Sequence, residues 1–417
     1  MRVLIISTFE KNGGAAVAAS RLGAALNANG VKARMLVRDK SSDHPWVIPL
    51  DKSPRLKLRF IWERVCIWIE NKFRKENLFA VSLANTGEDV TRLEDFRKAD
   101  VIHLHWVNQG MLSLKDIQKI VESGKPVIWT MHDMWNMTGI CHYTSECEHY
   151  RTKKCFDCPM LPGITAIAHK IFKRKEKLYQ HARIAFVGCS QWLAKKGKES
   201  VLLGNCQVES IPNPINTVLF APHPQQQIRI KRQLPCDKKL LLFGSMKVTD
   251  KRKGFDYLLQ ACCLLAEQYP SLKEELGIVM MGGQADEVVN QLPFPVYCMG
   301  FLNNEKDIAE VYNTADLYVT PALEENLPNT IMEALSCGIP AVGFEVGGIP
   351  EMIDHRQNGY VAHYKSAEDL AAGIFWSLYT ANHSELKKNA REKVIKNYSE
   401  EVVARQYIEL YQSKRKK

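Results

Sequence analysis

The sequence lacks the features of a secreted or membrane-spanning protein. Its opening apolar run at residues 1–7, MRVLIIS, is too short for a signal peptide and is soon followed by Gly13 and Gly14. No uninterrupted apolar stretch approaches the length that spans a bilayer. We therefore expect a cytoplasmic protein, in which the twelve cysteines are thiols or metal ligands rather than disulfides.

Two further absences narrow the fold and the function. The sequence contains no internal repeat and no low-complexity tract, and its 417 residues are enough for two domains of about 200 residues each. The G-x-G-x-x-G dinucleotide fingerprint is also missing, which argues against a dehydrogenase. An excess of 56 Lys and Arg over 46 Asp and Glu favours anionic partners, namely nucleotides, nucleic acid or a membrane surface.

The most informative stretch is PALEENLPNTIMEALSCGIPAVGFEVGGIPEMI, at residues 321–353. Pro328 is tolerated in the first turn of a helix, so we expect Glu325 in the loop before a helix and Glu333 about a turn and a half inside it. Both carboxylates can then face one cleft. The start of the helix, which runs through Leu327, Pro328, Asn329 and Thr330, offers backbone N–H groups that suit a phosphate, although Pro328 itself contributes none.

Two glycines complete this stretch. After the helix and a short apolar strand, Gly347 and Gly348 let the backbone approach a ligand without an intervening Cβ. Carboxylates are good acceptors for sugar or ribose hydroxyls, and amides suit a diphosphate. The stretch therefore predicts a nucleotide-sugar site.

The N-terminal part of the chain has the pattern of a doubly wound sheet. Residues 2–7 predict a strand and residues 15–29 a helix, with Gly13 and Gly14 in the turn between them. Strand, glycine turn and helix form the phosphate-facing unit of such a sheet, although an ordinary strand-to-helix turn is the alternative.

Histidines follow two further predicted strands, at residues 99–106 and 126–131. Ligand sites of open parallel sheets lie beyond the carboxyl ends of the strands. His132, Asp133 and His105 occupy such positions, which makes them candidates for a site.

These motifs resemble the retaining glycosyltransferases of the GT-B fold, in the large fourth family that builds bacterial polysaccharides, sucrose and glycogen. The resemblance rests on the E-x7-E pair, on the small-residue turn with Gly338, Pro340 and Val342, and on the GGIPEMI run. It implies an α/β protein with two doubly wound, Rossmann-like domains facing a cleft. We expect an acceptor-side domain at 1–214, a nucleotide-sugar domain at 215–385 and a C-terminal helix at 386–417 that crosses back.

The resemblance also implies a role for each site residue. Lys253 and Arg252 would neutralise the leaving diphosphate, Arg252 substituting for the arginine that the family has where this chain has Ser245. Glu333 would bind the donor ribose and Glu325 the donor sugar.

On the acceptor side, His132 would orient the sugar or stabilise the oxocarbenium ion, with His105 as the reserve candidate. Gly13 and Gly14 would lie under the donor diphosphate or the acceptor. Family members of this kind generally need no catalytic metal.

The predicted function is retaining transfer of a sugar from a UDP- or GDP-sugar to a glycan or lipid-linked acceptor, in the synthesis of a cell-surface polysaccharide. The alternative is a non-catalytic nucleotide or carbohydrate binder on the same fold, and Ser245 is its best support. A nucleic-acid partner rests on net charge alone and has no matching motif.

A cysteine-rich insertion at 141–158 supports a second hypothesis. Cys155 and Cys158 have the C-x2-C spacing of a zinc knuckle, whereas the spacing from Cys141 to Cys147 is wider than usual. One interpretation is a structural zinc held by the four thiolates, bracing the loop that carries His132. Free thiols or a disulfide are the alternatives.

Residues 56–75, LKLRFIWERVCIWIENKFRK, combine helical apolar spacing with six basic residues. A basic, tryptophan-bearing amphipathic helix can lie in a membrane interface. The segment therefore predicts either peripheral docking on an anionic membrane, which would bring the enzyme to a lipid-linked acceptor, or a helix packed on its own domain.

Overall fold

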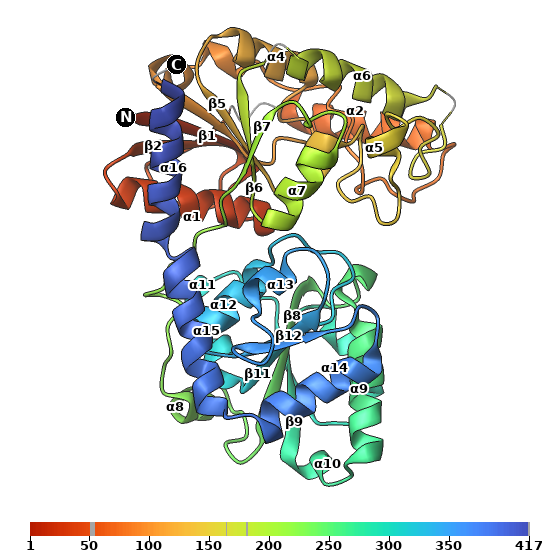
Figure 1. Cartoon of the computed structure of the whole chain (residues 1–417), viewed down its shortest axis with the longest axis vertical. Coiled ribbons are helices and arrows are strands. Elements are labelled where there is room, and N and C mark those ends of the chain that lie inside the picture. Colours follow the sequence, from red (N-terminus) through yellow and green to blue (C-terminus); the bar gives the residue numbers. More distant parts are fainter. Residues whose placement is uncertain (51–54, 164, 181, 416–417) are drawn as a thin grey trace. The chain divides into compact units, whose positions relative to one another are not determined.

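The computed structural model describes residues 1–50, 55–163, 165–180 and 182–415. Contacts divide the chain into two compact units, one of residues 1–214 with 403–417 and the other of residues 215–402. Each unit is a parallel sheet with helices packed against it (Figure 1). The predicted α/β architecture of two Rossmann-like domains is confirmed.

The sheet of the first unit has seven parallel strands in the order β3-β2-β1-β4-β5-β6-β7. Its strands are β1 (Arg2–Phe9), β2 (Lys32–Asp39), β3 (Val47–Pro49), β4 (Val101–Leu104), β5 (Val127–Met131), β6 (Ile184–Gly188) and β7 (Gln207–Ser210). Its helices before residue 214 are α1 (Gly14–Ala28), α2 (Arg55–Glu70), α3 (Glu94–Lys98), α4 (Leu114–Glu122), α5 (His149–Thr152), α6 (Ile167–Gln180) and α7 (Gln191–Glu199). The strand order reverses between β1 and β4, which is where such sheets bind ligands.

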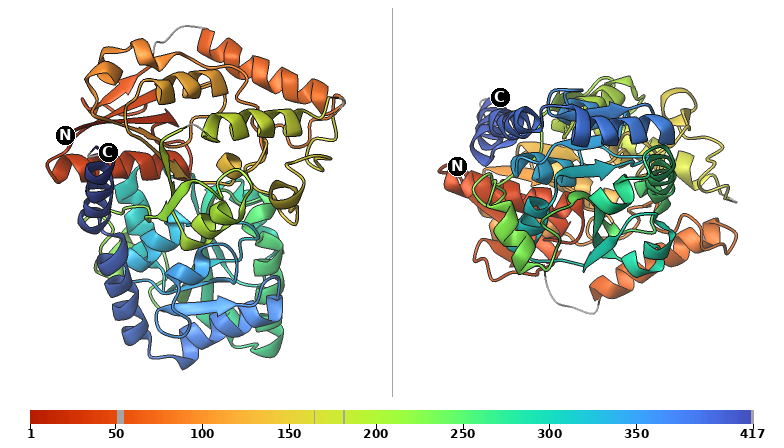
Figure 2. Two further views of the ribbon diagram at one scale, coloured as in Figure 1. Left: turned by 45° about the horizontal axis from the view of Figure 1, so that its top comes forward. Right: turned by 90° about the horizontal axis from the view of Figure 1, so that it is seen from below.

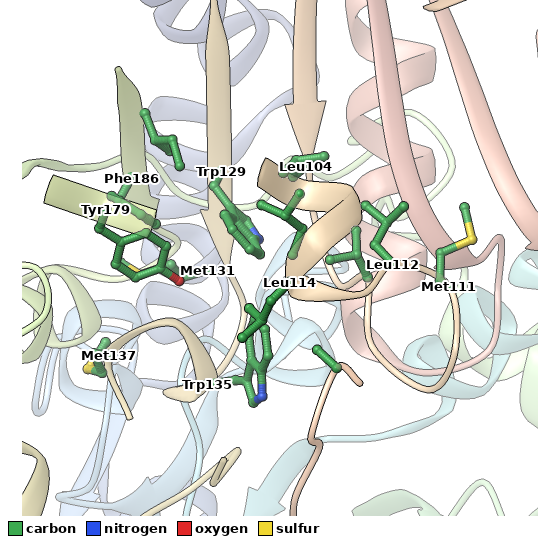
Figure 3. Packing of buried hydrophobic residues seen from close by; sticks show 14 of the residues in the cluster. Leu104, Met111, Leu112, Leu114, Trp129, Met131, Trp135, Met137, Tyr179 and Phe186 are labelled. Carbon is green, nitrogen blue, oxygen red and sulfur yellow. The ribbon is translucent and has the colours of Figure 1, made fainter. Parts of the chain in front are cut away.

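Aromatic packing fills one face of this sheet. The ring centroids of Trp129 and Phe186 are 6.0 Å apart, and Trp135 lies 6.0 Å from Trp129 (Figure 3). The central strands β4, β5 and β6 are buried along their whole length because both faces of a parallel sheet are covered. On the other face, residues of α1 and of the last helix α16 (Glu400–Arg415) share one buried cluster with the strands.

The sheet of the second unit has six parallel strands in the order β10-β9-β8-β11-β12-β13. The strands are β8 (Lys239–Lys247), β9 (Leu276–Gly283), β10 (Val296–Gly300), β11 (Leu317–Thr320), β12 (Ala341–Phe344) and β13 (Gly359–Ala362). The helices are α8 (Gln225–Lys231), α9 (Phe255–Gln268), α10 (Leu272–Glu275), α11 (Glu305–Thr314), α12 (Asn329–Ser336), α13 (Ile349–Met352), α14 (Ala367–Phe375) and α15 (His383–Tyr398). Here the strand order reverses between β8 and β11.

The C-terminal segment differs from the single helix expected at 386–417. It consists of α15 and α16, and Ser399 separates them because its backbone is extended, with φ −60° and ψ 149°. Arg391 of α15 donates to the Ser336 carbonyl at 2.6 Å within the second unit. Only the chain from Val403 onward groups with the first unit.

Two tyrosines tie α16 to the first sheet through buried polar contacts. The Tyr411 hydroxyl lies 2.7 Å from Nδ1 of His103 on β4, and the Tyr407 hydroxyl lies 2.8 Å from Oγ1 of Thr130 on β5. Buried polar groups of this kind are stable only when they are paired. No helix in the described part of the chain is long and apolar enough to cross a membrane.

Candidate functional site

In the second unit, two loops meet at the point where the strand order reverses. The turn after β8 contains a short 3₁₀ helix at Lys251–Lys253, and the loop after β11 carries Glu325. The Lys253 ammonium forms an ion pair with the Glu325 carboxylate, although the two residues are 72 positions apart. Their side chains are 29% and 14% exposed, so both groups reach the surface of the site. The structure thus brings together a cation, which suits a diphosphate, and a carboxylate, which suits hydroxyl groups.

Two glycines allow these loops to approach so closely. Gly254 has φ +72°, and a Cβ at this residue would lie 1.8 Å from the carbonyl oxygen of Pro321. Gly347 has φ +60°, and its Cβ would lie 1.6 Å from the carbonyl oxygen of Glu325. The left-handed conformation and the lack of space both require glycine. The geometry of the Lys253–Glu325 pair therefore depends on positions outside the pair.

Glu333 lies deeper than its spacing from Glu325 suggested. It is only 7% exposed on α12, and its Oε2 accepts a hydrogen bond of 3.0 Å from the Tyr312 hydroxyl. Burial and the neighbouring Glu333 carboxylate raise the pKa of Tyr312 well above its usual range, so this phenol stays a donor. Tyr312 was not predicted as a site residue, because nothing distinguishes it from the other buried residues of an amphipathic helix.

In the basic turn after β8, Arg252 is paired with a carboxylate rather than available to a diphosphate as the sequence predicted. The Arg252 guanidinium, half exposed, pairs with Asp250 at 2.8 Å, and Asp250 also accepts the Arg252 backbone N–H at 3.0 Å. The hydroxyl of Ser245, at the position of the family's arginine, is buried without a hydrogen-bond partner among the described residues. Lys253 is therefore the cation of this turn that lies against Glu325.

The start of α12 matches the expected helix entry. Pro328 is the N-cap residue, and no side chain caps this end among the residues that the structure describes. Leu327 and Pro328 are buried, whereas Asn329 and Thr330 are half-buried. A helix N-terminus without a side-chain cap keeps its amides oriented for an anion.

In the first unit, two of the predicted histidines meet at the carboxyl edge of the sheet. His105 follows β4 and His132 follows β5, and these strands are neighbours. Nδ1 of His105 lies 2.9 Å from Nε2 of His132. Burial lowers the pKa of His132 to about 4 and that of His105 well below its usual range, so both imidazoles are neutral at pH 7. Neutral imidazoles can donate and accept hydrogen bonds at the same time.

The loop after β5 is held by a buried polar network. Asp133 accepts hydrogen bonds from Trp106 Nε1 at 2.9 Å and from Trp135 N at 2.9 Å, and it lies 2.6 Å from Nδ1 of His142. Burial alone would raise the pKa of Asp133, but His142 and these donors outweigh it, so the pKa is lowered. The carboxylate is therefore ionised and rigidly placed beside His132.

A fully buried lysine, Lys175 of α6, donates hydrogen bonds to the same loop. Lys175 Nζ donates to the carbonyls of Trp135 at 2.6 Å and Thr138 at 3.1 Å, and it lies 3.3 Å from the centre of the Trp135 ring. Burial lowers its pKa well below the usual range. The sequence did not single out this lysine, because it belongs to a strongly basic helix whose other lysines are solvated.

Gly13 and Gly14 lie where the sequence placed them, in the turn after β1. Gly13 has φ +92° and is the N-cap residue of α1, with no side chain capping that end in the described chain. A Cβ at Gly13 would have nothing within 4 Å, so this glycine is required by its backbone conformation rather than by a neighbouring atom.

The cysteine-rich insertion brings two of its thiols into contact. The Cys141 thiol donates to the sulfur of Cys158, and Cys155 accepts the Gly139 N–H at 3.2 Å. Among the described residues, no group of three or more His, Cys, Asp or Glu side chains is arranged to hold a metal ion. The structural zinc at Cys141, Cys147, Cys155 and Cys158 stays a prediction.

Comparison with known proteins assigns a class to these two units. An Anabaena protein, HepE in complex with UDP-glucose, superimposes with a TM-score of 0.63 at 16% identity, covering 99% of this chain and 100% of that one. The fold is therefore GT-B, the two-unit architecture of many glycosyltransferases. Residues 237–378 match the family described as Glycosyl transferases group 1.

Two curated relatives lead to the same enzyme class. An uncharacterised glycosyltransferase of Methanocaldococcus jannaschii is 23% identical over 342 residues, 78% of this chain and 85% of that protein. The amylovoran biosynthesis glycosyltransferase AmsK of Erwinia amylovora is 25% identical over 213 residues, 47% of this chain and 50% of that protein. The protein is a glycosyltransferase whose second unit carries a group 1 domain, and the predicted enzyme class is confirmed.

Gly254→Ala tests the close approach that holds the Lys253–Glu325 pair. We expect Gly254→Ala to lower the melting temperature and weaken donor binding, because the new methyl group overlaps the Pro321 carbonyl. Gly300→Ala is the matched control in the same unit, since Gly300 has φ +65° but open space around it. The control should cost only about 1–2 kcal/mol of left-handed backbone strain. Equal losses of stability in calorimetry would contradict the steric argument.

The buried histidines predict a decline of stability at acid pH. The folded pKa of His103 is about 3 against an ordinary 6.5, so its stabilising effect is complete above pH 6.5 and is lost as pH falls toward 3. Between pH 7.5 and 5 the His103 side chain becomes protonated in the unfolded state but not in the folded state. This difference lowers the free energy of unfolding by about 2 kcal/mol.

Denaturant unfolding followed by tryptophan fluorescence measures this effect, because seven of the eight tryptophans lie in the first unit. In His103→Gln, which cannot titrate, we expect the loss between pH 7.5 and 5 to shrink by about 2 kcal/mol relative to wild type. An unchanged pH dependence would show that folding does not lower the pKa of His103.

Proposed function

We propose that this glycosyltransferase moves a sugar, with retention of configuration, from a UDP- or GDP-sugar to a glycan or lipid-linked acceptor in cell-surface polysaccharide synthesis. The observation that carries the proposal is the Lys253–Glu325 pair at the strand-order reversal of the second unit. The UDP-glucose complex of HepE, a protein of the same fold, supports a nucleotide-sugar donor. The amylovoran role of AmsK supports a polysaccharide product.

In the proposed mechanism, the main task of the site is to stabilise the negative charge that develops on the leaving diphosphate. Lys253 would neutralise the diphosphate oxygens as the bond from the anomeric carbon to the leaving oxygen breaks. The amides at the start of α12 would bind the same group through the helix dipole. Arg252 would add charge by exchanging Asp250 for the diphosphate, just as Lys253 would exchange Glu325.

The carboxylates and His132 would position the sugars. Glu325, freed from Lys253 when the diphosphate takes up the ammonium, would accept hydrogen bonds from hydroxyls of the donor sugar. Glu333, held by Tyr312, would accept from the donor ribose through its remaining capacity. His132 would hydrogen-bond the transferred sugar. Basic residues and a helix N-terminus would take the place of a catalytic metal.

A binder without catalytic activity is the second candidate function. It is favoured by the unpaired, buried hydroxyl of Ser245 where the family has an arginine on the diphosphate. Such a protein would bind nucleotide sugars through Lys253 and Glu325 but would release no nucleotide diphosphate.

The functional test measures release of UDP or GDP from a panel of nucleotide sugars, with and without glycan acceptors. We expect Glu325→Gln to lower kcat/KM by roughly a hundredfold or more, because the carboxylate is lost from the reacting sugar. Glu324→Gln, the adjacent residue, is the matched control. Donor binding without turnover by wild type would favour the binder, and full turnover by Glu325→Gln would exclude Glu325 from the reaction.

We also propose that helix α2 docks the first unit on an anionic membrane, which would bring it to a lipid-linked acceptor. In Figure 2 this orange helix lies at the periphery of the first unit. Leu58 is 64% exposed, Ile61 53% and Trp62 58%, and Phe73 beyond the helix is 62% exposed. Exposed apolar groups that cluster in this way mark an interaction surface.

Charge beside the apolar side chains indicates the lipid that this surface would prefer. Lys57, Lys72, Arg74 and Lys75 are exposed along the same segment. Each cation near an anionic bilayer adds on the order of 1 kcal/mol, and the apolar side chains add burial in the interface. The inward side of α2 is instead fixed by Glu63, whose Oε1 accepts the backbone N–H groups of Leu83 and Ala84.

Liposome flotation tests the membrane proposal. We expect binding to vesicles that contain phosphatidylglycerol and little binding to phosphatidylcholine vesicles, with a loss of severalfold in Ile61→Ser/Trp62→Ser and in Lys72→Glu/Lys75→Glu. Ile230→Ser in the second unit is the control, because Ile230 is 70% exposed outside this surface. Equal flotation with both vesicle types would contradict the proposal.

A further inference from the structure

We infer that His105 is a positioning residue that holds His132 in the tautomer protonated at Nδ1, so that His132 presents a hydrogen-bond donor rather than a base. The consequence for catalysis rests on the proposed sugar transfer, whereas the tautomer itself is a property of the first unit alone. The inference starts from the 2.9 Å contact between His105 Nδ1 and His132 Nε2.

Exactly one proton lies between these two nitrogens, since a hydrogen bond between neutral imidazoles needs one donor and one acceptor. If His105 donates from Nδ1, the proton of His132 is on its other nitrogen, Nδ1. If His132 donates from Nε2, the proton of His105 must be on its own Nε2. The Cys189 thiol beside His132 Nδ1 can donate or accept and is compatible with both arrangements, so the surroundings of His105 Nε2 decide between them.

Nε2 of His105 is buried and has no hydrogen-bond partner among the described residues. The second arrangement would leave a buried N–H without an acceptor, whereas the first leaves only a lone pair without a donor. Unsatisfied buried N–H groups are the rarer of the two in proteins. The first arrangement is thus favoured, with His105 donating and His132 protonated at Nδ1.

The residues around His105 keep its ring from turning over to exchange its nitrogens. His105 is 3% exposed, its ring centroid is 4.3 Å from that of His103, and its carbonyl accepts the Trp129 Nε1–H at 3.0 Å. His103 is held at both nitrogens, by Tyr411 at 2.7 Å and by Thr130 at 2.8 Å. The row of rings behind His132 is therefore anchored to α16 and β5.

This arrangement limits what His132 can do in the reaction. Its basic nitrogen is occupied by His105, so His132 cannot remove a proton from an acceptor hydroxyl through Nε2 without breaking that bond. The protonated Nδ1, which lies 4.0 Å from the Cys189 sulfur, is then the donor nitrogen of His132. A donor at this position suits an oxygen of the transferred sugar, such as a hydroxyl or a carbonyl.

Nitrogen-15 NMR of full-length protein labelled with ¹⁵N-histidine tests the assignment at pH 7.5. Two-bond proton correlations distinguish protonated from bare imidazole nitrogens, and spectra of His132→Gln and His105→Gln identify the two residues. We expect Nδ1 to be the protonated nitrogen of both. A wild-type His132 protonated at Nε2 would overturn the inference.

Substitutions at His105 provide the second readout. In His105→Phe, which keeps the ring but removes the donor, we expect protonation of His132 to shift toward Nε2 and kcat to fall at least about tenfold at unchanged donor KM. His105→Asn places an amide near the former Nδ1 and should restore both in part. His44→Phe, at an exposed histidine of the same unit that is not part of this cluster of rings, should leave the tautomer and kcat unchanged.

The two proposals fail separately in these experiments. If His132 keeps its Nδ1 proton in His105→Phe, His105 does not set the tautomer, whatever the activity. If the spectra change as expected but wild type transfers no sugar from any donor, the proposed function fails and the tautomer assignment stands.

Discussion

The candidate donor site depends on one constraint, the close packing of two loop backbones in the second unit. Gly254 meets the Pro321 carbonyl and Gly347 meets the Glu325 carbonyl at distances that exclude any side chain. This packing lets Lys253 reach Glu325 from a loop 72 residues earlier in the chain. The chemistry of the charged pair is therefore set by glycines that bear no charge, and the pair lies at the strand-order reversal where parallel sheets bind ligands.

The candidate site of the first unit differs from the Lys253–Glu325 pair, because its histidines are buried and neutral. His103, His105 and His132 are kept neutral by burial, and Asp133 is kept ionised by its donors. The cost of burying these polar groups is offset by hydrogen bonds that reach from β4 and β5 to Tyr411 at the end of the chain. A site built in this way is rigid, which suits positioning better than proton exchange.

The class of fold was predictable because each doubly wound unit repeats a local pattern. Largely apolar strands of three to nine residues, glycine turns and amphipathic helices are encoded by neighbouring residues, and the strand-end position of His132 followed from the same pattern. The prediction of a single helix from residue 386 was wrong in one respect. Ser399 divides this segment into two helices, which pack in different units. Both halves are amphipathic, so their periodicity does not show the division.

The sequence by itself determined the α/β class and the enzyme class, and it predicted a boundary near residue 215 and a donor site around Glu325 and Glu333. Only the tertiary structure decided that Lys253 meets Glu325, that Glu333 is buried against Tyr312 and that His105 lies against His132. The physical reason is the order of the strands. Neighbours in a parallel sheet are chosen by long-range packing, so residues that share a site can be far apart in the chain, and no local pattern records their distance.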